Sequence, residues 1–125
     1  MTMPQDTASR RFLLVEDEAM IALLVEDMLE DLGHELVKVA TRLEDAVAAA
    51  GTEAVDLAIL DLNLGGALTY PAADVLAERG IPFIFATGYG SGGLKEGYAA
   101  RPTLQKPFNT EALEQAIGQA LGRGA

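Results

Sequence analysis

The sequence predicts an α/β protein in which helices cover both faces of a parallel sheet. Short hydrophobic runs alternate with stretches of helical periodicity, and this alternation is typical of parallel strands joined by right-handed crossovers. Several runs end abruptly at polar or charged residues, which are Glu16-Asp17, Asp61, Thr87 and Lys106. If each run is a strand, these residues lie at the carboxyl edge of the sheet, where open α/β sheets bind ligands.

The first half of the chain is predicted to hold three strands and two helices. Apolar residues at helical spacing predict an amphipathic first helix, and Gly33 lies where a C-cap glycine belongs. Thr41 is expected to cap the second helix, and Gly51 to end it. The third strand is the most apolar, as expected of a strand buried on both faces. The predicted strands cover 11–15, 35–40 and 55–60, and the predicted helices cover 18–32 and 42–50.

The second half is predicted to hold two further strands, over 83–86 and 103–105, and two helices, over 72–79 and 110–121. Pro71 suits the first turn of the earlier helix, and Asn109 is expected to cap the later one. The segment from residue 88 to 97 contains five glycines. Since each glycine costs a helix about 1 kcal/mol relative to alanine, any helix there is expected to be short or disordered. Tyr70 and Tyr98 are expected to be packing residues.

Length and charge indicate a single acidic domain. The chain has 125 residues and a net charge of −10, which disfavours nucleic acid and anionic membranes as partners. It has no cysteine, which excludes disulfides and thiolate catalysis and fits a reducing cytoplasm. No apolar run approaches the roughly 20 residues of a membrane span. We expect residues 1–10 to form a mobile arm and residues 11–122 the domain, with no output domain.

The residues that end the runs belong to motifs whose order resembles the response-regulator receiver domain. The motifs are Leu14-Val15-Glu16-Asp17-Glu18, Leu60-Asp61-Leu62-Asn63, Ala86-Thr87-Gly88 and Gln105-Lys106-Pro107-Phe108. The separation of Asp17 and Asp61 also fits that family, and the resemblance extends from Arg11 to about Leu121. It implies a flavodoxin-like, doubly wound sheet of five parallel strands in the order 2-1-3-4-5, with helices on both faces.

The resemblance also implies a site for a divalent cation. Mg²⁺ prefers oxygen ligands, and Glu16, Asp17 and Asp61 are expected to bind it. Carboxylates this close would repel one another without a cation, which would raise at least one pKa. By family analogy, the backbone carbonyl of Asn63 is a further ligand, whereas its side chain is not implied.

Three residues are expected to handle the phosphoryl group itself. A carboxylate can attack phosphorus, and Asp61 is implied as the phosphoacceptor. Lys106 can bridge a phosphoryl oxygen, and can pair with a carboxylate when phosphate is absent. Thr87 can donate its hydroxyl to a phosphoryl oxygen. The family geometry further implies a cis peptide bond between Lys106 and Pro107.

The sequence departs from the usual receiver near the predicted fourth and fifth strands. The aromatic residue expected three positions before the lysine is Thr103. The fourth strand instead ends Phe85-Ala86-Thr87-Gly88-Tyr89, which resembles a subfamily of small α-proteobacterial receivers with a Phe-Ala-Thr-Gly-hydrophobic-Tyr motif. There the switch residues would be Thr87 and Tyr89. We expect residues 88–100 to be mobile in the unphosphorylated protein and to become ordered on phosphorylation.

The predicted function is that of a stand-alone, cytoplasmic receiver of two-component signalling. It would accept a phosphoryl group on Asp61 from a sensor histidine kinase, of the HWE or a related class by subfamily resemblance, or from a phosphotransfer protein. The group would later be lost by attack of water, with no other enzymatic turnover. The protein would act as a phosphate sink, as a relay, or as a switch that binds a downstream protein.

Three other functions fit parts of the pattern. A phosphatase of the haloacid-dehalogenase type also uses Asp, Mg²⁺, Thr and Lys, but it needs a second acid where this chain has Asn63. Its late acidic pair would have to come from Glu111 and Glu114, which lie on a predicted helix. A flavodoxin-like cofactor binder would need a Ser- and Thr-rich phosphate loop where this chain has an acidic run beginning at Glu16. The third alternative is a receiver that docks without being phosphorylated.

Overall fold

A computed structural model describes residues 9–88, 94, 95, 97, 98 and 100–122. The strands of the main sheet are β1 (Arg11–Val15), β2 (Glu35–Ala40), β3 (Leu57–Asp61), β6 (Phe83–Thr87) and β7 (Thr103–Gln105). A small hairpin consists of β4 (Asn63–Leu64) and β5 (Ala67–Leu68). The helices are α1 (Ala19–Asp31), α2 (Leu43–Thr52), α3 (Tyr70–Glu78) and α4 (Thr110–Ala120). Most of the predicted arm lies outside the described residues.

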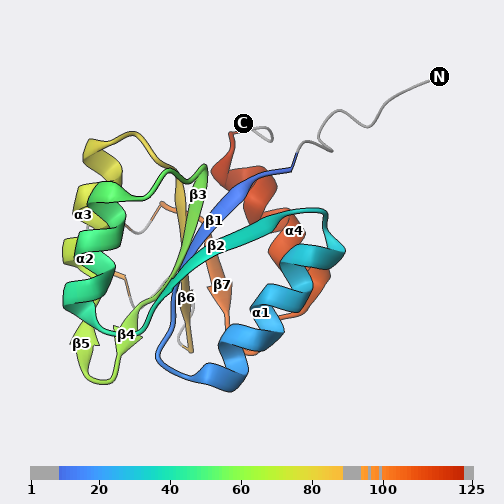
Figure 1. Cartoon of the computed structure of the whole chain (residues 1–125), viewed down its shortest axis with the longest axis horizontal. Helices are drawn as coiled ribbons and strands as arrows, with labels where there is room; N and C mark the ends of the chain where they lie inside the picture. The colour runs from blue at the N-terminus through green and yellow to red at the C-terminus, as the bar shows by residue number, and fades with distance from the viewer. Residues whose placement is uncertain (1–8, 89–93, 96, 99, 123–125) are drawn as a thin grey trace.

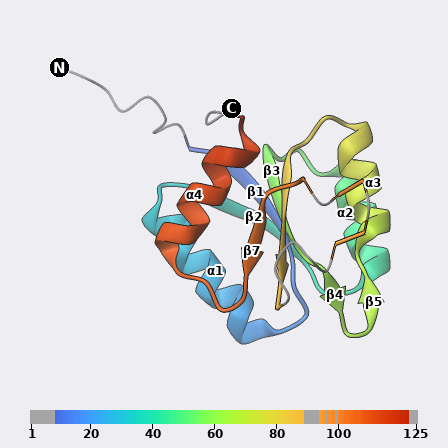
Figure 2. The same cartoon turned by 180° about the vertical axis from the view of Figure 1, so that it is seen from behind.

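The main sheet is parallel and has the strand order β2-β1-β3-β6-β7. Helices α1 and α4 cover one face, and α2 and α3 cover the other (Figures 1 and 2). Counted along the chain as strands of the main sheet, this order is 2-1-3-4-5. The predicted doubly wound fold and its strand order are therefore confirmed.

Two cores lie on opposite faces of the sheet, because successive side chains of a strand point to opposite sides. Leu13, Leu60 and Phe85 pack under α2 and α3. Their strand neighbours, such as Ile59 and Ile84, pack under α1 and α4. Strands β3 and β6 are buried along their whole length, which is the reason for their continuous apolar sequence.

The register of the parallel strands brings their carboxyl ends to one edge. Val15 pairs with Leu60, and Asp61 pairs with Ala86. One strand further along the sheet, Thr87 pairs with Gln105. Residues that follow β1 and β7 and residues that end β3 and β6 therefore meet at the same edge, as the sequence predicted.

Some helix boundaries differ from the predicted ones for local reasons. Helix α2 runs through Gly51 to Thr52, because Gly51 does not adopt the left-handed conformation with which a glycine ends a helix. Its N-cap is Arg42, without a side-chain cap, so the predicted cap at Thr41 is wrong. Acidic residues in the first turn of α2 offset the missing cap. Asn109, in contrast, caps α4 through Ala112 N–H at 2.8 Å, as predicted.

The connection that follows Asp61 forms the β4–β5 hairpin. Gly65 and Gly66 make its two-residue turn, with φ of 62° and 101°. Positive φ at both central positions is the signature of a type I′ turn, which glycine adopts without a steric penalty. Helix α3 then begins at Tyr70, two residues earlier than predicted.

Tyr98, a described residue between β6 and β7, packs against α3 through its aromatic ring. The ring of Tyr98 stacks on that of Tyr70 with centroids 5.4 Å apart, and Leu94 is buried. Both tyrosines are packing residues, as expected. Among residues 94, 95, 97, 98 and 100, none is helical, which agrees with the expectation that no long helix forms there. The expected mobility of residues 88–100 stays a prediction, because much of that stretch, Tyr89 included, lies outside the described residues.

Candidate functional site

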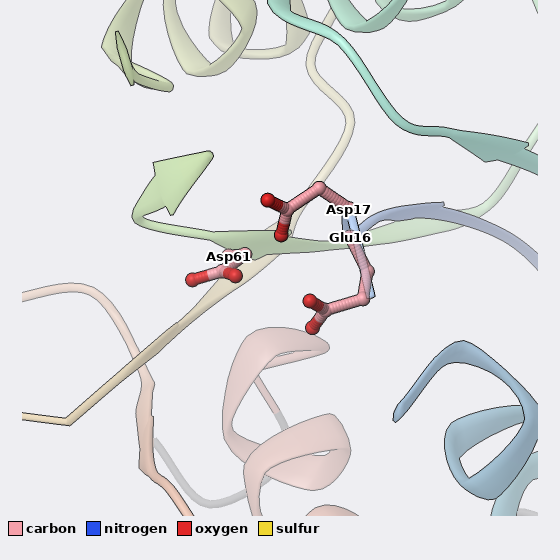
Figure 3. A group of neighbouring side chains, drawn as sticks. All are labelled: Glu16, Asp17 and Asp61. Atoms are coloured by element: carbon pink, nitrogen blue, oxygen red, sulfur yellow. The ribbon is translucent and has the colours of Figure 1, made fainter. Parts of the chain in front are cut away.

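Three carboxylates from two strand ends form an acidic cluster. Glu16 and Asp17 follow β1, and Asp61 is the last residue of β3; each offers an oxygen within 4.8 Å of the others (Figure 3). Glu16 and Asp61 are buried, with 3% and 8% of their surface exposed, whereas Asp17 is exposed. The structure thus brings together the side chains that the sequence predicted as metal ligands.

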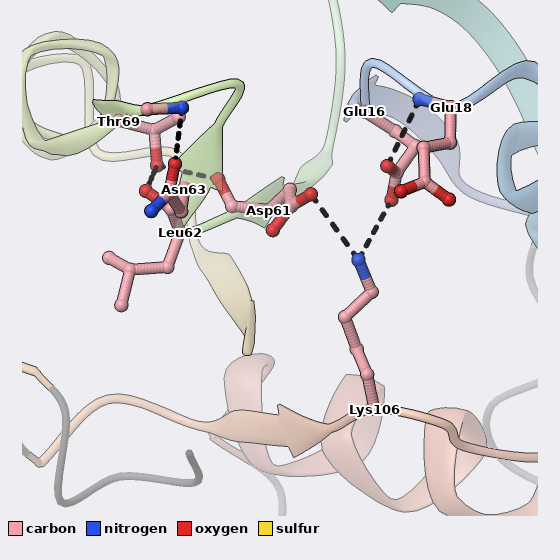
Figure 4. A network of polar contacts seen from close by, with 8 residues as sticks. Glu16, Glu18, Asp61, Leu62, Asn63, Thr69 and Lys106 are labelled. Carbon is pink, nitrogen blue, oxygen red and sulfur yellow. Dashed lines mark hydrogen bonds and ion pairs between the residues drawn. The ribbon is translucent and has the colours of Figure 1, made fainter. Parts of the chain in front are cut away.

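Lys106 faces two of these carboxylates from the end of β7. Its Nζ lies 3.3 Å from Asp61 Oδ2 and 3.4 Å from Glu16 Oε1 (Figure 4). Both distances exceed those of tight charge-assisted hydrogen bonds, so the contacts are mainly coulombic. The backbone N–H of Lys106 donates to the carbonyl of Thr87 at 2.9 Å, and the predicted cis peptide bond to Pro107 is present.

The charges of the cluster perturb one another. Burial raises the pKa of Glu16, and repulsion from Asp61 raises it further, against the opposing effects of the Glu18 N–H and Lys106. For Lys106, burial opposes the charged form, but the carboxylates of Asp61 and Glu16 outweigh it and the pKa of the ammonium is raised. Lys106 therefore stays a charged ammonium. It faces a cluster of three carboxylates, so the site has more acidic groups than basic ones.

The donor set fits a small hard cation. Mg²⁺ takes oxygen ligands, usually one or two carboxylates with water, and excess negative charge beside a single ammonium attracts it. The β4–β5 hairpin lies against the exposed acid of the cluster, because a Cβ added to Gly65 would be 3.4 Å from Asp17 Oδ2. The side chain of Asn63 accepts a hydrogen bond from Gly66 N–H at 2.6 Å, so it is engaged within the hairpin. The role predicted for the Asn63 carbonyl stays a prediction.

Thr87 lies at the same edge of the sheet. It is buried, with 4% of its surface exposed, and it follows Ala86, the residue that pairs with Asp61. Its place agrees with the predicted contact to a phosphoryl group, and that contact stays a prediction. Tyr89, the other predicted switch residue, lies outside the described residues.

Sequence reasoning overlooked Thr69, which contacts the backbone of the predicted nucleophile. Its hydroxyl donates to the carbonyl of Asp61 at 2.8 Å (Figure 4). A threonine just before a helix normally signals an N-cap, and that signal could have drawn attention to the position. It would have indicated the wrong partner, however, because the hydroxyl makes no cap hydrogen bond to α3.

An apolar groove adjoins the acidic cluster. Its volume is about 260 Å³, and it is lined by Ile21, Leu24, Val25, Met28, Lys106, Pro107 and Phe108. On helix α1, the groove residue Leu24 is 53% exposed, and Met20 and Leu23 are 70% and 61% exposed. Lys106 belongs to both the groove and the cluster. Apolar side chains of α1 therefore lie next to the charged site.

The sequence matches the family model described as the response regulator receiver domain over residues 12–118. The chain belongs to this family. Its members are phosphoacceptor signalling domains that histidine kinases phosphorylate. In the part of the chain that the structure describes, no helix is long and apolar enough to cross a membrane.

Curated relatives share about a third of their residues with this chain. The transcriptional regulatory protein PdtaR of Mycobacterium tuberculosis is 33% identical over 118 residues, which cover 91% of this chain and 58% of PdtaR. The phyllosphere-induced regulator PhyR of Methylorubrum extorquens is 33% identical over 114 residues, which cover 87% of this chain and 42% of PhyR. The chain thus spans about half the length of these relatives.

One similar solved structure is of a chain that matches this one over nearly its whole length. The solution structure of SdrG from Sphingomonas melonis Fr1 has a TM-score of 0.81 and 38% identity, over 94% of this chain and 99% of that one. The BeF3-activated conformation of SdrG, from Pseudomonas melonis Fr1, has a TM-score of 0.75 and 40% identity, over 89% of this chain and 94% of that one. The described fold is the fold of these receivers.

Proposed function

We propose that this protein acts as a receiver of two-component signalling and that Asp61 is its phosphoacceptor. The observation that carries the proposal is the placement of Asp61 beside a lysine ammonium and two further carboxylates, at the carboxyl end of a buried central strand. Family membership favours this function over the phosphatase and the cofactor binder.

The reaction needs a nucleophile and a counter-charge. A carboxylate oxygen of Asp61 attacks the phosphorus of a phosphohistidine, an O–P bond forms, and the P–N bond breaks. Its electron pair goes to the imidazole of the donor, which takes up a proton. Lys106, 3.3 Å from Asp61, is placed to hold a transferred phosphoryl oxygen, and the Thr87 hydroxyl binds another. Attack of water on phosphorus later releases inorganic phosphate and restores the Asp61 carboxylate.

Glu16, Asp17 and Asp61 would hold Mg²⁺, with the backbone carbonyl of Asn63 as a further ligand. The support is the cluster of oxygens within 4.8 Å together with its excess negative charge. When bound, the cation neutralises charge that develops on the phosphoryl oxygens. Glu16 is buried and held by Lys106 and the Glu18 N–H, so its carboxylate would meet the cation in a fixed position.

The phosphodonor is a sensor histidine kinase, of the HWE or a related class, or a phosphotransfer protein. The groove along α1 supports a protein donor, because it begins at Lys106 and offers apolar side chains beside the phosphoacceptor. A donor docked there would bury Leu24, which is otherwise exposed. The acidic charge of −10 supports neither a nucleic acid nor an anionic membrane as partner. We place the protein in the cytoplasm.

The phosphorylated protein acts as a phosphate sink, a relay or a switch for a downstream protein. The switch would use Thr87 and Tyr89, with residues 88–100 becoming ordered on phosphorylation. Likeness to SdrG, of which a BeF3-activated conformation has been solved, supports an activated state. Likeness to PhyR, described in Bartonella quintana as an anti-anti-sigma factor, supports a protein as the downstream partner.

Incubation with acetyl phosphate and Mg²⁺, followed by intact mass measurement, tests the proposal. One added phosphoryl group is expected. It should not form in excess chelator, and it should be absent from Asp61→Ala. Asp45→Asn, which alters an exposed acid of α2, serves as the matched control and should be phosphorylated normally. Phosphorylation of Asp61→Ala to the normal extent would refute the assignment. No phosphorylation by any donor would favour the unphosphorylated docking domain.

A further inference from the structure

We propose that Thr69 is a positioning residue for phosphoryl transfer, which acts through its hydroxyl on the backbone of the phosphoacceptor. The inference rests on the proposed function of Asp61. Thr69 is eight residues away from Asp61 along the chain. Its hydroxyl bonds to backbone carbonyls, and among the described residues it makes no hydrogen bond to a carboxylate of the acidic cluster or to the Lys106 ammonium. Its effect would reach the site through the main chain alone.

The hydrogen bonds of Thr69 converge on the point at which β3 leaves the sheet. Its hydroxyl is 2.8 Å from the carbonyl oxygen of Asp61 and 3.3 Å from that of Leu62. Its backbone N–H also donates to the Leu62 carbonyl at 3.0 Å. Figure 4 shows these bonds on the side of Asp61 opposite to Lys106. The residue has no exposed surface, so water does not compete for these carbonyls.

The inter-strand hydrogen bonds of β3 end near Asp61 and Leu62, where these bonds of Thr69 begin. The last bond of the β3–β6 ladder is donated by Leu62 N–H to Ala86 O at 2.9 Å. Beyond it the chain turns into the β4–β5 hairpin. Buried carbonyls nearly always have hydrogen-bond partners, and at this exit Thr69 supplies one for Asp61 and two for Leu62. Thr69 therefore supplies the hydrogen-bond donors that a neighbouring strand would otherwise supply to these carbonyls.

The Thr69 hydroxyl donates to the carbonyls of Asp61 and Leu62, although its position would also let it cap α3. Thr69 is the N-cap residue of α3, where a threonine side chain ordinarily accepts from the helix N–H groups. No such bond forms, and the α3 N–H groups of Ala72 and Ala73 bond instead to the Thr69 carbonyl, at 3.0 and 3.1 Å. The position thus serves the phosphoacceptor backbone in preference to capping the helix by its side chain.

Thr69 is itself held by a rigid neighbour. The next residue, Tyr70, is buried against Phe85 and Tyr98, with ring centroids 5.6 and 5.4 Å apart. Its hydroxyl accepts from Lys95 N–H at 2.7 Å. The hydroxyl of Thr69 therefore offers a fixed point against which the Asp61–Leu62 peptide is oriented.

Orientation of that peptide matters because it sets the direction of the Asp61 side chain. The carboxylate must lie within reach of Lys106 and the metal-binding acids at once. Productive constellations need positions held to about 0.5 Å, and a displacement of about 1 Å can slow a reaction about 100-fold. Loss of the hydroxyl would let the peptide rotate and spread the carboxylate over several positions.

The test compares Thr69→Val, which keeps the shape but lacks the donor, with Thr69→Ser, which keeps the donor. The rate of phosphorylation by acetyl phosphate is measured as a function of donor concentration, at saturating Mg²⁺ and well below the unfolding temperature of each protein. We expect the maximal rate of Thr69→Val to fall about 10- to 100-fold, with the half-saturating donor concentration unchanged. Thr69→Ser should retain most of the maximal rate.

Thr52→Val is the matched control, because the Thr52 hydroxyl also donates to a backbone carbonyl, that of Ala48 in α2 at 2.9 Å. It should be phosphorylated at the parental rate. A purely structural role of Thr69 would lower the unfolding temperature without changing the rate of the folded protein. A folded Thr69→Val with the parental maximal rate would overturn the inference.

Should Thr69→Val not fold, Thr69→Cys takes its place, because a thiol is a weak donor of similar shape. It should be slower than Thr69→Ser by several-fold, and equal rates would overturn the inference. Asp61→Ala separates the two proposals. If it is phosphorylated like the parent, the proposed function itself fails. If only Asp61 is phosphorylated and the Thr69 variants match the parent, the positioning role alone is wrong.

Discussion

The Nζ of Lys106 lies 3.3 Å from Oδ2 of Asp61, although 45 residues separate them along the chain. The sheet order creates this contact, because β6 lies between β3 and β7 and the ends of all three strands are in register. The side chain of Lys106 is 23% exposed, and those of its partners Glu16 and Asp61 are 3% and 10% exposed. The ammonium therefore compensates carboxylates that water reaches poorly.

Replacing Lys106 by Met should destabilise the metal-free protein. Two buried carboxylates would then face each other without a cation, and we expect the free energy of unfolding to fall by roughly 1–3 kcal/mol, less than the cost of breaking a fully buried ion pair. Urea denaturation in chelator measures the loss. Addition of Mg²⁺ should stabilise Lys106→Met more than the parent, because a bound cation replaces the missing charge.

Lys38→Met is the control for this experiment, because it removes an exposed lysine from β2. It should leave stability nearly unchanged in chelator and in Mg²⁺. Equal stability of Lys106→Met and the parent in chelator would show that the ion pair contributes nothing to the fold.

Replacing Glu16 by Gln should weaken Mg²⁺ binding. The substitution removes one charge from the acidic cluster while it keeps the size and an acceptor oxygen, and we expect the dissociation constant to rise about tenfold, which corresponds to about 1.4 kcal/mol. Titration calorimetry with MgCl₂ measures it. Glu18→Gln is the matched control, since Glu18 is exposed and lies outside the cluster. Equal weakening by both substitutions would mean that overall charge, not the cluster, sets the affinity.

Leu24→Asp should impair phosphorylation by a kinase without impairing the chemistry. Leu24 lines the groove beside Lys106 and is 53% exposed, so a docked donor would bury it. Burial of a leucine contributes about 1.5–3 kcal/mol, and we expect transfer from a cognate histidine kinase to slow at least about tenfold. The rate with acetyl phosphate should stay unchanged.

Leu68→Asp changes a leucine of similar exposure, 49%, on the β4–β5 hairpin and provides the comparison. It should retain normal transfer from the kinase. If Leu24→Asp and Leu68→Asp behave alike, the donor does not dock along α1.

The hydroxyl of Tyr98 donates to Asp74 of α3, and this contact predicts a stability change at high pH. Burial, the hydrogen bond and the negative charge of Asp74 raise the pKa of Tyr98 to about 12, above its ordinary value of about 10. The neutral hydroxyl is the form that the folded state favours. Its contribution should be complete below pH about 10 and should be lost as the pH rises through about 12.

Tyr98→Phe should therefore be less stable than the parent near neutral pH, and the difference should shrink between pH about 10 and about 12. Ultraviolet absorbance of the ionised phenol, as the difference between parent and Tyr98→Phe, reports the titration directly. Asp74→Asn removes the charge but keeps an acceptor, and it should lower the pKa of Tyr98 only in part, because burial remains. A titration near the ordinary value in the parent would contradict the hydrogen bond.

The sequence by itself determined the architecture and the main chemical groups of the site. Apolar runs and helical periodicity depend on which faces are buried, and these local patterns identified the five strands of the main sheet and the helices α1 to α4. Strands whose last residues are polar place those residues at one edge of a parallel sheet, whatever the details of packing. For this reason the sequence alone assigns Glu16, Asp61 and Lys106 to one site.

Only the tertiary structure decided how the remaining groups are used. The hydroxyl of Thr69 could cap its helix or serve another backbone, and the choice depends on where β3 leaves the sheet. The left-handed turn at Gly65 and Gly66, and the helical Gly51, differ in conformation although the residue is the same. Tyr98, which lies between β6 and β7 in the sequence, meets Asp74 because its ring packs against α3. The contact of Tyr98 with Asp74 joins segments 24 residues apart in the chain, and its energy depends on burial and geometry that no local pattern encodes.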